Sequence, residues 1–497
     1  MEALADANSA EEAFAALQSW NLDQAARRTD AYVVEQELHR GGMEVMRFML
    51  EENFQSRGVG DVGPYIEAEP NQAESEEQEP VRLGQRRQHR RNYESLFGTI
   101  HIERLGYGGR GQQSIHPLDE ELNLPGRKYS HLLQERGAHR CGRGPFDEAL
   151  DELQTTCAGH VPKRQLEQVV VDAAQDFQEF YKERGGSAPS PAASGSIITC
   201  GIDCKGVPKR KTEAERAEPR KIRLGKGEKR TKKKMATVAS VHTTAPYPRT
   251  AEQVVANLMD PDAPKPEEPR PRPEGRRLWA SVKQNKDEVI KEVAEEMQRR
   301  DPDGVKTAVC VMDGEKALKT RALKHLGRVF PALILVLDII HVVEYLWKSA
   351  YAFHEPESEA ARLWVRERLL RILTGEVSLV ARGMRQSATK QNLSPKNREE
   401  VDKTCNYFLN NKDRMRYDEY LAKGLPIASG SAEGACGHLV KDRMEITGAS
   451  WDVDEDGAEA VLRIRALDKS GDWDEYWKFH MEQDRKRLYA TPWKAAA

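Results

Sequence analysis

Apolar residues recur at two different spacings along the chain, and each spacing predicts a different kind of element. From about Ala10 to Gln55 they recur at helical spacing with few helix-breaking residues, which predicts a helical N-terminal region. The stretch LFGTIHIERLGYG instead alternates Ile100 and Ile102 with polar residues. Because strict alternation is typical of a half-buried strand, this stretch predicts a β-hairpin.

Two short helices are predicted after the hairpin. The first has one apolar face, made by Phe146, Ala149, Leu150 and Leu153. An Ala-Gly-His turn ends it, and a Val-Pro pair opens the second helix. This pattern favours a helix-turn-helix, although an ordinary helical hairpin has the same pattern. In the helix-turn-helix interpretation, the second helix begins with side chains that can contact phosphates and base edges of DNA: Lys163, Arg164 and Gln165.

After the Gly/Ser/Pro/Ala-rich residues 185–195, strands and helices follow in an order typical of an α/β domain. The segment SIITCGID predicts a strand ending at Asp203, and KMATVASVHTT and RRLWASV predict two more. A helix over Lys286 to Arg300 then leads to the strand TAVCVMDG, which ends at Asp313, and another helix leads to ALILVLD. Consecutive strands are expected to pair antiparallel and helix-connected strands parallel. The predicted fold class is therefore α/β, a mixed five-stranded sheet flanked by helices. An all-helical insertion is expected from about Val342.

Composition narrows the class of protein. The 497 residues, 38% of them hydrophobic, are enough for several domains with ordinary cores. No run approaches the ~18 apolar residues of a membrane helix, and the acidic, helix-forming start is unlike a signal peptide. Seven irregularly spaced cysteines suit a reducing compartment. We therefore expect a cytoplasmic protein with no membrane partner.

The net charge of −3 hides a strong segregation of charge. Residues 71–80 are acidic, whereas Lys205 to Lys234 contains 14 Lys or Arg and four acidic residues. Such a block predicts a mobile arm that meets a polyanion, or, more simply, a flexible loop kept soluble by its charge. Under the first interpretation, its DNA contacts are Lys209, Arg210, Lys211, Lys232, Lys233 and Lys234.

The segment GLPIASGSAEGACGHLVKDRM surrounds Glu433 with Ser, Gly and Ala, residues poorly chosen for a purely structural helix. Small neighbours allow a bulky partner to approach the carboxylate. Three acids at one site, Asp203, Asp313 and Glu433, need a cation, and carboxylates without nearby Cys or His favour Mg²⁺, with Mn²⁺ as a substitute. Two such ions support phosphoryl transfer on nucleic acid. Downstream phosphate contacts are expected from His438, Lys441 and Arg443. Each Asp taken alone is equally typical of a turn or a cap.

Four motifs carry a family resemblance: GIDCKGV, VMDGEKAL, LDIIHVVEYLWKSAYAFH and IASGSAEGACGHLVKDRMEITGASW. They resemble the transposases of bacterial insertion sequences of the Kra type, relatives of the Mutator-like DDE transposases. The resemblance extends from about Tyr93 to about Phe479. It implies an RNase H-like catalytic core and the metal-binding set Asp203, Asp313 and Glu433, with a helical insertion before the glutamate.

The resemblance also implies a role for Asp338 and His341, which match a DxxH element associated with active-site architecture and DNA positioning. Two alternatives remain open for Asp338. It is well suited to an N-cap of the following helix, or it replaces Asp313 as a metal ligand.

These inferences predict the following regions. They are 1–63, N-terminal helices; 64–92, an acidic and basic linker; 93–184, the hairpin and helix-turn-helix that recognise DNA; 185–195, a linker; 196–341, the first part of the catalytic domain; 342–425, the helical insertion; 426–480, the last catalytic helix region with Glu433; and 481–497, a C-terminal tail.

The expected function is metal-dependent cleavage and strand transfer of double-stranded DNA, at transposon ends and at the target. At least two protomers are expected on the DNA, in a bacterial, nucleoid-associated setting. A structure-specific nuclease of RNase H-like fold and an inactive DNA-binding derivative are the alternatives.

Overall fold

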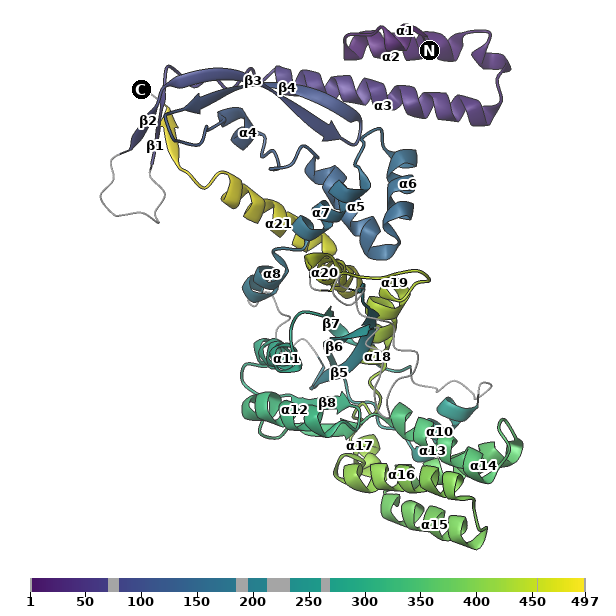
Figure 1. Cartoon of the computed structure of the whole chain (residues 1–497). Helices are drawn as coiled ribbons and strands as arrows, with labels where there is room; N and C mark the ends of the chain where they lie inside the picture. Colours follow the sequence, from purple (N-terminus) through teal and green to yellow (C-terminus); the bar gives the residue numbers. More distant parts are fainter. Residues whose placement is uncertain are drawn as a thin grey trace. The chain divides into compact units, whose positions relative to one another are not determined.

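The computed structural model describes residues 2–69, 80–184, 195–211, 233–260, 269–453 and 455–495, with the backbone alone at 2, 3 and 431–433. It divides into two compact units. Unit 1 comprises Met1–Phe180 and Asp472–Ala497, and unit 2 comprises Tyr181–Gly471 (Figure 1). None of the helices in the described ranges combines the length and the apolar character needed to cross a bilayer.

Unit 1 is built around a long antiparallel ribbon of β3 (Gln85–Ser95) and β4 (Gly98–Gly108). Its helices are α1 (Glu2–Ala5), α2 (Ala10–Leu22), α3 (Ala31–Gln55), α4 (Pro117–Glu121), α5 (His131–Arg143), α6 (Phe146–Thr156) and α7 (Lys163–Ala173). Ile100 and Ile102 on β4 pack with Tyr93, Leu118 and Leu124 in one core. The alternation seen in the sequence therefore gives β4 its buried face.

The C-terminal segment belongs to unit 1. Helix α21 (Trp473–Leu488) is followed by β10 (Trp493–Ala495), which pairs with β1 (Ile66–Ala68), and β1 pairs in turn with β2 (Val81–Leu83). The buried Tyr476 hydroxyl on α21 donates to the carbonyl of Ala173. Unit 1 is thus assembled from two stretches of chain separated by the whole of unit 2.

Two of the expected boundaries need correction. Residues 64–92 were expected to form a linker, but β1, β2 and most of β3 lie there. The first half of β3 is polar on both faces, so no alternation marks it, and its place is fixed by backbone pairing with β4. The ranges 426–480 and 481–497 were expected to be a catalytic helix region and a tail, but α21 crosses the boundary between them and packs in unit 1, and β10 pairs with β1.

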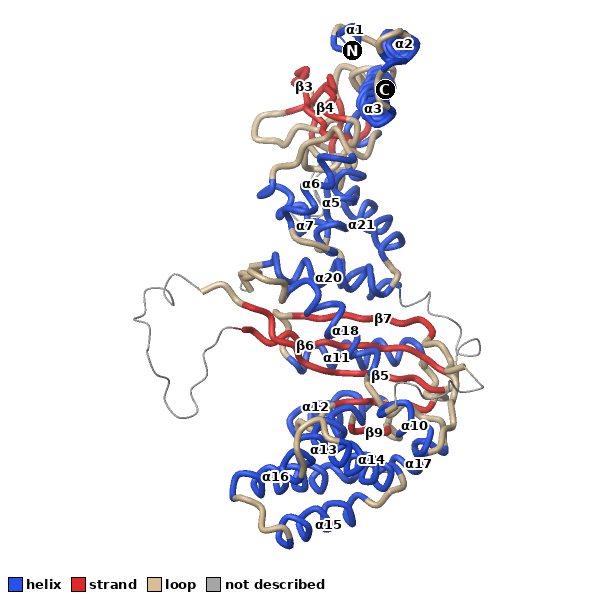
Figure 2. Tube along the Cα trace, turned by 90° about the vertical axis from the view of Figure 1, so that its right-hand side faces the viewer, coloured by secondary structure: helices blue, strands red, loops and turns tan. Residues whose placement is uncertain are grey.

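Unit 2 contains the predicted mixed five-stranded sheet, which is confirmed. Its strands are β5 (Ile197–Pro208), β6 (Lys233–Thr244), β7 (Glu274–Ser281), β8 (Thr307–Met312) and β9 (Ile334–Leu337), in the spatial order β7-β6-β5-β8-β9. The first three in sequence pair antiparallel, and β5–β8 and β8–β9 are parallel. Figure 2 shows β5, β6 and β7 lying side by side. The short apolar β8 is almost fully buried, as expected for a central parallel strand.

Helices complete unit 2. Around the sheet lie α10 (Ala251–Met259), α11 (Lys286–Arg300), α12 (Lys316–Val329) and α20 (Asp456–Ser470), and the insertion consists of α13 (Ile339–Phe353), α14 (Glu359–Leu373), α15 (Val377–Lys390), α16 (Pro395–Asn411) and α17 (Tyr417–Ala422). Buried residues of β8, β9 and the insertion form one continuous core. The insertion therefore packs directly against the strand ends where the predicted acids lie.

Candidate active site

Asp203 and Asp313 are neighbours on adjacent parallel strands. Ile202 on β5 is in register with Met312 on β8, and each is followed by its aspartate. Both carboxylates are half-buried. Burial raises the pKa of Asp313, and the negative charges of Glu315 and Asp203 raise it further, against the lowering effects of the Glu315 N–H and of His341. The site therefore concentrates negative charge that a cation would neutralise.

The segment around Glu433 is attached to Asp203. Helix α18 (Gly430–Ala435) continues into the π-helix η5 (Cys436–Lys441), and the Cys436 thiol donates to Asp203 Oδ2 at 3.1 Å. The other oxygen, Oδ1, accepts the N–H of Cys204 at 2.6 Å. Burial raises the pKa of the Cys436 thiol, and the charge of Asp203 adds to the effect, so it stays a protonated donor. Small residues in α18 thus allow this helix to lie close against the first strand.

Glu433 itself lies in α18, three residues before Cys436, but its side chain is outside the described part of the structure. Its role as a third carboxylate stays a prediction. In the π-helix that follows, the carbonyls of Leu439 and His438 accept hydrogen bonds from buried Arg465 on α20.

Asp338 fastens two chain segments near the site. Its Oδ1 accepts the N–H of Ile340 at 2.8 Å, which is the N-cap bond of α13. Its Oδ2 accepts both the N–H of Ser429, at 3.0 Å, and the Ser429 hydroxyl. At 2% exposure, with both oxygens engaged, this carboxylate ties the start of α13 to the residue before α18. The geometry favours the cap over the metal-ligand alternative.

His341 lies one turn into α13, with its side chain 35% exposed and Nδ1 3.4 Å from Glu344 Oε2. It is near enough to Asp313 to lower the pKa of that carboxyl electrostatically. The two residues of the DxxH element therefore act on different partners, since Asp338 accepts hydrogen bonds from Ile340 and Ser429, whereas His341 contributes to lowering the pKa of Asp313.

Sequence reasoning missed an ion pair beside the carboxylates. Lys286 Nζ lies 2.6 Å from Glu315 Oε2, and Lys286 also interacts with Cys204. Burial lowers the pKa of Lys286, but Glu315 and Cys204 outweigh it and the pKa is raised. The lysine therefore stays cationic beside Cys204, the residue that follows Asp203. Glu315 could have been noticed in the sequence, because it directly follows the Asp313-Gly314 turn. Nothing in the sequence singles out Lys286.

The helical insertion supports the turn at Asp313. Buried Arg414 donates to the Asp313 carbonyl at 3.0 Å. The ring of Tyr407, stacked on Tyr345 with centroids 3.9 Å apart, lies where a side chain at Gly314 would be. A residue larger than glycine would overlap that ring. The insertion thus fixes the backbone that carries the second aspartate.

One predicted DNA contact is corrected by burial. Arg443 in α19 (Asp442–Met444) is only 3% exposed, with its guanidinium 4.8 Å from the centre of the Trp451 ring. The expectation assumed continuous α-helix after Glu433, but the π-helical turns shift the phase of the residues that follow. Lys441 and His438 are exposed, and His438 Nδ1 lies 3.1 Å from Asp442. These two remain predicted phosphate contacts.

Most of the basic block, residues 212–232 including Lys232, lies outside the described residues. Its flanks are described and are attached to the segment after η5. Arg210 N–H donates to the Trp451 carbonyl at 2.7 Å, Lys209 forms a bridge with Trp451, and Lys233 forms an ion pair with Glu445. The Lys234 ammonium lies 3.4 Å from the carbonyl of Val453, and Lys211 is exposed.

The two predicted short helices are α6 and α7, and α7 begins at Lys163. Lys163 Nζ lies 2.6 Å from Asp147 on α6, while Arg164 is exposed and Gln165 half-buried. Residues 157–162 join the helices, a longer connection than the three or four residues of a typical helix-turn-helix. DNA recognition by this pair stays a prediction.

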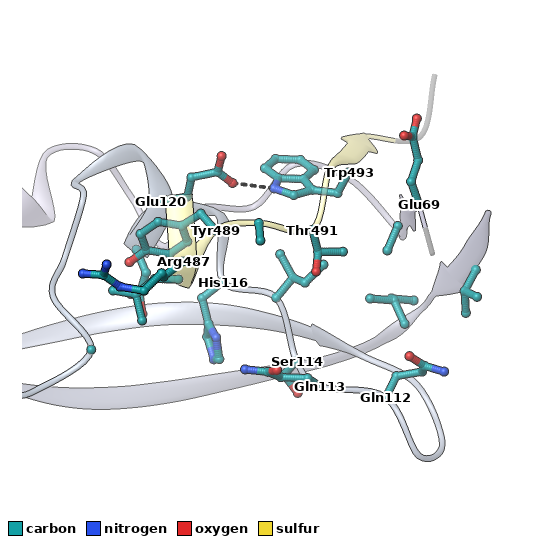
Figure 3. Close-up of a pocket in the computed structure, with 18 of the residues that line it drawn as sticks. Glu69, Gln112, Gln113, Ser114, His116, Glu120, Arg487, Tyr489, Thr491 and Trp493 are labelled. Atoms are coloured by element: carbon teal, nitrogen blue, oxygen red, sulfur yellow. Dashed lines mark hydrogen bonds between the residues drawn. The ribbon is translucent and has the colours of Figure 1, made fainter. Parts of the chain in front are cut away.

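Unit 1 also contains a cavity of about 500 Å³. Figure 3 shows its lining, where Trp493 Nε1 donates to Glu120 Oε2 at 2.6 Å and His116 lies below. Burial, reinforced by Arg104 and His89, lowers the pKa of His116 to about 4, so the imidazole is neutral at physiological pH. No sequence pattern indicates this cavity, because its walls come from stretches of chain far apart in sequence.

The donor set in unit 2 fits a hard divalent cation. Asp203 and Asp313 offer carboxylate oxygens at neighbouring strand positions. Burial raises the pKa of Asp313, the charges of Glu315 and Asp203 add to the effect, and a bound cation would offset both causes. No cluster of three or more metal-ligating side chains occurs among the residues described, a set that leaves out the Glu433 side chain.

Comparison with known proteins adds little. No family model matches the sequence, and no curated protein aligns with it. A chain of the Drosophila P element transposase strand transfer complex is similar in structure at 9% identity and a TM-score of 0.26. That match covers 71% of this chain and 80% of the other.

Proposed function

We propose that the chain is a DNA transposase with an RNase H-like catalytic core, which cleaves transposon ends and joins them to target DNA. The observation that carries the proposal is the pairing of β5 and β8, which brings Asp203 and Asp313 together, with the Glu433 helix attached to Asp203 through Cys436. Two acids from neighbouring strands and one from a helix form the donor set expected for metal-dependent phosphoryl transfer.

The sheet order supports this proposal independently of the acids. Antiparallel first, second and third strands, extended by two parallel strands beside the first, give the order β7-β6-β5-β8-β9. This order is that of an RNase H-like sheet. The four motifs that resemble insertion-sequence transposases lie on β5, on β8 with the turn after it, on β9 with α13, and on α18 with η5.

In the proposed mechanism, Asp203, Asp313 and Glu433 would hold two Mg²⁺ ions. When bound, such ions would supply activation of the attacking oxygen and stabilisation of the leaving oxygen of the phosphodiester. Asp338 holds the residue before α18 in place, and the Lys286–Glu315 pair sets the charge beside Asp203. Two DNA ends must be joined in one reaction, so at least two protomers assemble on DNA.

The test is an end-cleavage and joining assay with a labelled duplex carrying the terminal repeat of the element that encodes the chain. The natural chain is compared with Asp203→Asn, Glu433→Gln and the control Glu399→Gln, which changes an exposed glutamate of α16. Metal-dependent cleavage and joining should disappear in the first two variants and persist in the control, with end binding unchanged. Cleavage without joining would indicate a nuclease, and end binding without cleavage by the natural chain would indicate an inactive derivative.

A further inference from the structure

The first half of β3 is an unusual surface. Residues 85–90, with the sequence QRRQHR, are all exposed, and three of the six are arginines. An antiparallel strand with one solvated face normally alternates between buried and exposed residues. Here both faces of the strand are polar and exposed, so these side chains contribute no burial to the folded unit.

The ribbon has two strands, and one of its edges is open. Strand β3 pairs with β4 across Gln85 to Ser95, and no strand in the described ranges pairs with the opposite edge of β3 between Gln85 and Asn92. The β4 edge is covered instead, because Tyr107 exchanges two backbone hydrogen bonds with Ile115. A two-stranded ribbon with one open edge fits the major groove of duplex DNA.

The arginines of β3 divide into two groups. Arg91 is half-buried and lies 2.8 Å from Asp119, which also pairs with Arg104 of β4, and Arg86 pairs with Asp61. These contacts fix the ribbon. Arg87 and Arg90, by contrast, are exposed and form no ion pair with any residue that the structure describes.

One acid lies beside this surface. Glu103 is opposite Arg90 in the ribbon register, but among the described residues the two form no ion pair, and the Glu103 carboxylate accepts a hydrogen bond from Gln88 at 3.4 Å. Two guanidinium groups therefore remain on a rigid support, flanked by the amides of Gln85 and Gln88. Arginine guanidinium groups donate charge-assisted hydrogen bonds to phosphate oxygens, and glutamine amides can form hydrogen bonds with base edges.

We propose that the β3–β4 ribbon enters the major groove of duplex DNA with the open edge of β3 leading, so that Arg87 and Arg90, which project from opposite faces of the strand, contact phosphates on the two sides of the groove. The inference rests on the proposed function and adds to it the surface by which unit 1 meets DNA. It differs from the helix-turn-helix prediction, since the contacts come from a strand that the sequence assigned to a linker.

The test measures DNA binding by the full chain without divalent metal, by fluorescence anisotropy. The probes are the labelled terminal-repeat duplex and one of its single strands. The variant is Arg87→Ala/Arg90→Ala. The matched control, Arg366→Ala/Arg382→Ala, removes two exposed arginines from the helical insertion.

Each phosphate contact contributes about 0.9 to the slope of log affinity against log salt concentration. Loss of two contacts lowers the slope by about 1.8, so the affinity deficit of the variant should shrink about 12-fold between about 50 and 200 mM salt. The control pair should keep the natural slope. Thermal unfolding of the variant should match that of the natural chain, because neither arginine is paired.

Three results would overturn the proposal: natural duplex affinity in the ribbon variant, an affinity deficit that is independent of salt, or equal binding of the single strand and the duplex by the natural chain. Cleavage data separate its failure from that of the proposed function. A ribbon variant that binds and cleaves normally contradicts only the ribbon, whereas a natural chain that binds through the ribbon without cleaving contradicts only the transposase.

Discussion

Replacing Asp338 should destabilise unit 2 far more than removing an ordinary helix cap. The carboxylate is 2% exposed and accepts three hydrogen bonds, from Ile340 N–H and from the N–H and hydroxyl of Ser429. In Asp338→Ala, the lost cap costs about 1 kcal/mol. The two unpaired groups of buried Ser429 cost about 1–3 kcal/mol each. We therefore expect a loss of about 3–7 kcal/mol.

The measurement is urea unfolding followed by circular dichroism, with Ser358→Ala as the matched control. Ser358 caps α14 by accepting the Ala361 N–H at 3.2 Å, and its hydroxyl donates to the carbonyl of exposed Glu355 at 2.7 Å. Because water can replace the bond to Glu355, the loss of Ser358 should cost only about 1 kcal/mol. Asp338→Asn should fall between the two, since its oxygen can keep the cap while its NH₂ faces the donors of Ser429. Equal losses for Asp338→Ala and Ser358→Ala would refute the reasoning, because the Ser429 bonds would then contribute nothing.

Three further predictions concern other parts of unit 2. Gly314→Ala should cost about 1–3 kcal/mol in thermal unfolding because its methyl group overlaps a tyrosine ring, whereas Gly383→Ala, with open space around it, should be neutral or stabilising. Burial lowers the pKa of His242 to about 4, whereas the imidazole of the unfolded chain binds a proton near pH 6.5. The free energy of unfolding should therefore fall as the pH drops from about 6.5 to 4. A His242→Phe chain whose free energy of unfolding falls equally steeply with pH would contradict this. Glu296→Gln should cost about 3–5 kcal/mol by urea titration, since it leaves buried Arg277 without its 2.6 Å carboxylate partner, and a change below about 1 kcal/mol would show that the pair is dispensable.

The sequence predicts the sheet of unit 2 well for a physical reason. Buried parallel strands are short apolar runs bounded by polar turns, so a strand such as TAVCVMDG and the aspartate after it are visible without a structure. The alternation in β4 is equally visible. Its partner β3 is not, because a strand polar on both faces carries no period and is held by backbone hydrogen bonds.

The surroundings of the carboxylates were harder to predict. The contact between Cys436 and Asp203 joins residues that are 233 positions apart in the sequence, so no local sequence pattern can predict it. The prediction that Arg443 contacts DNA was wrong because the residue is buried. A π-helical segment changes the side of the helix on which the following residues lie, and no sequence pattern predicts that segment. Lys286 reaches Glu315 and Cys204 because it is the first residue of α11, and no local pattern marks that contact.

The two-part construction of unit 1 sets the order in which the protein can be completed during translation. All five strands of the unit 2 sheet have been synthesised by residue 337, and α20 by residue 470. The N-terminal ribbon, although made first, lacks α21 and β10 until residues 473–495 have left the ribosome. A nascent chain can therefore finish the five-stranded sheet of unit 2 while its first-made unit is still open. A chain that stopped between residues 470 and 473 would have the complete sheet and α20 of unit 2 but would lack the helix and the strand that complete unit 1.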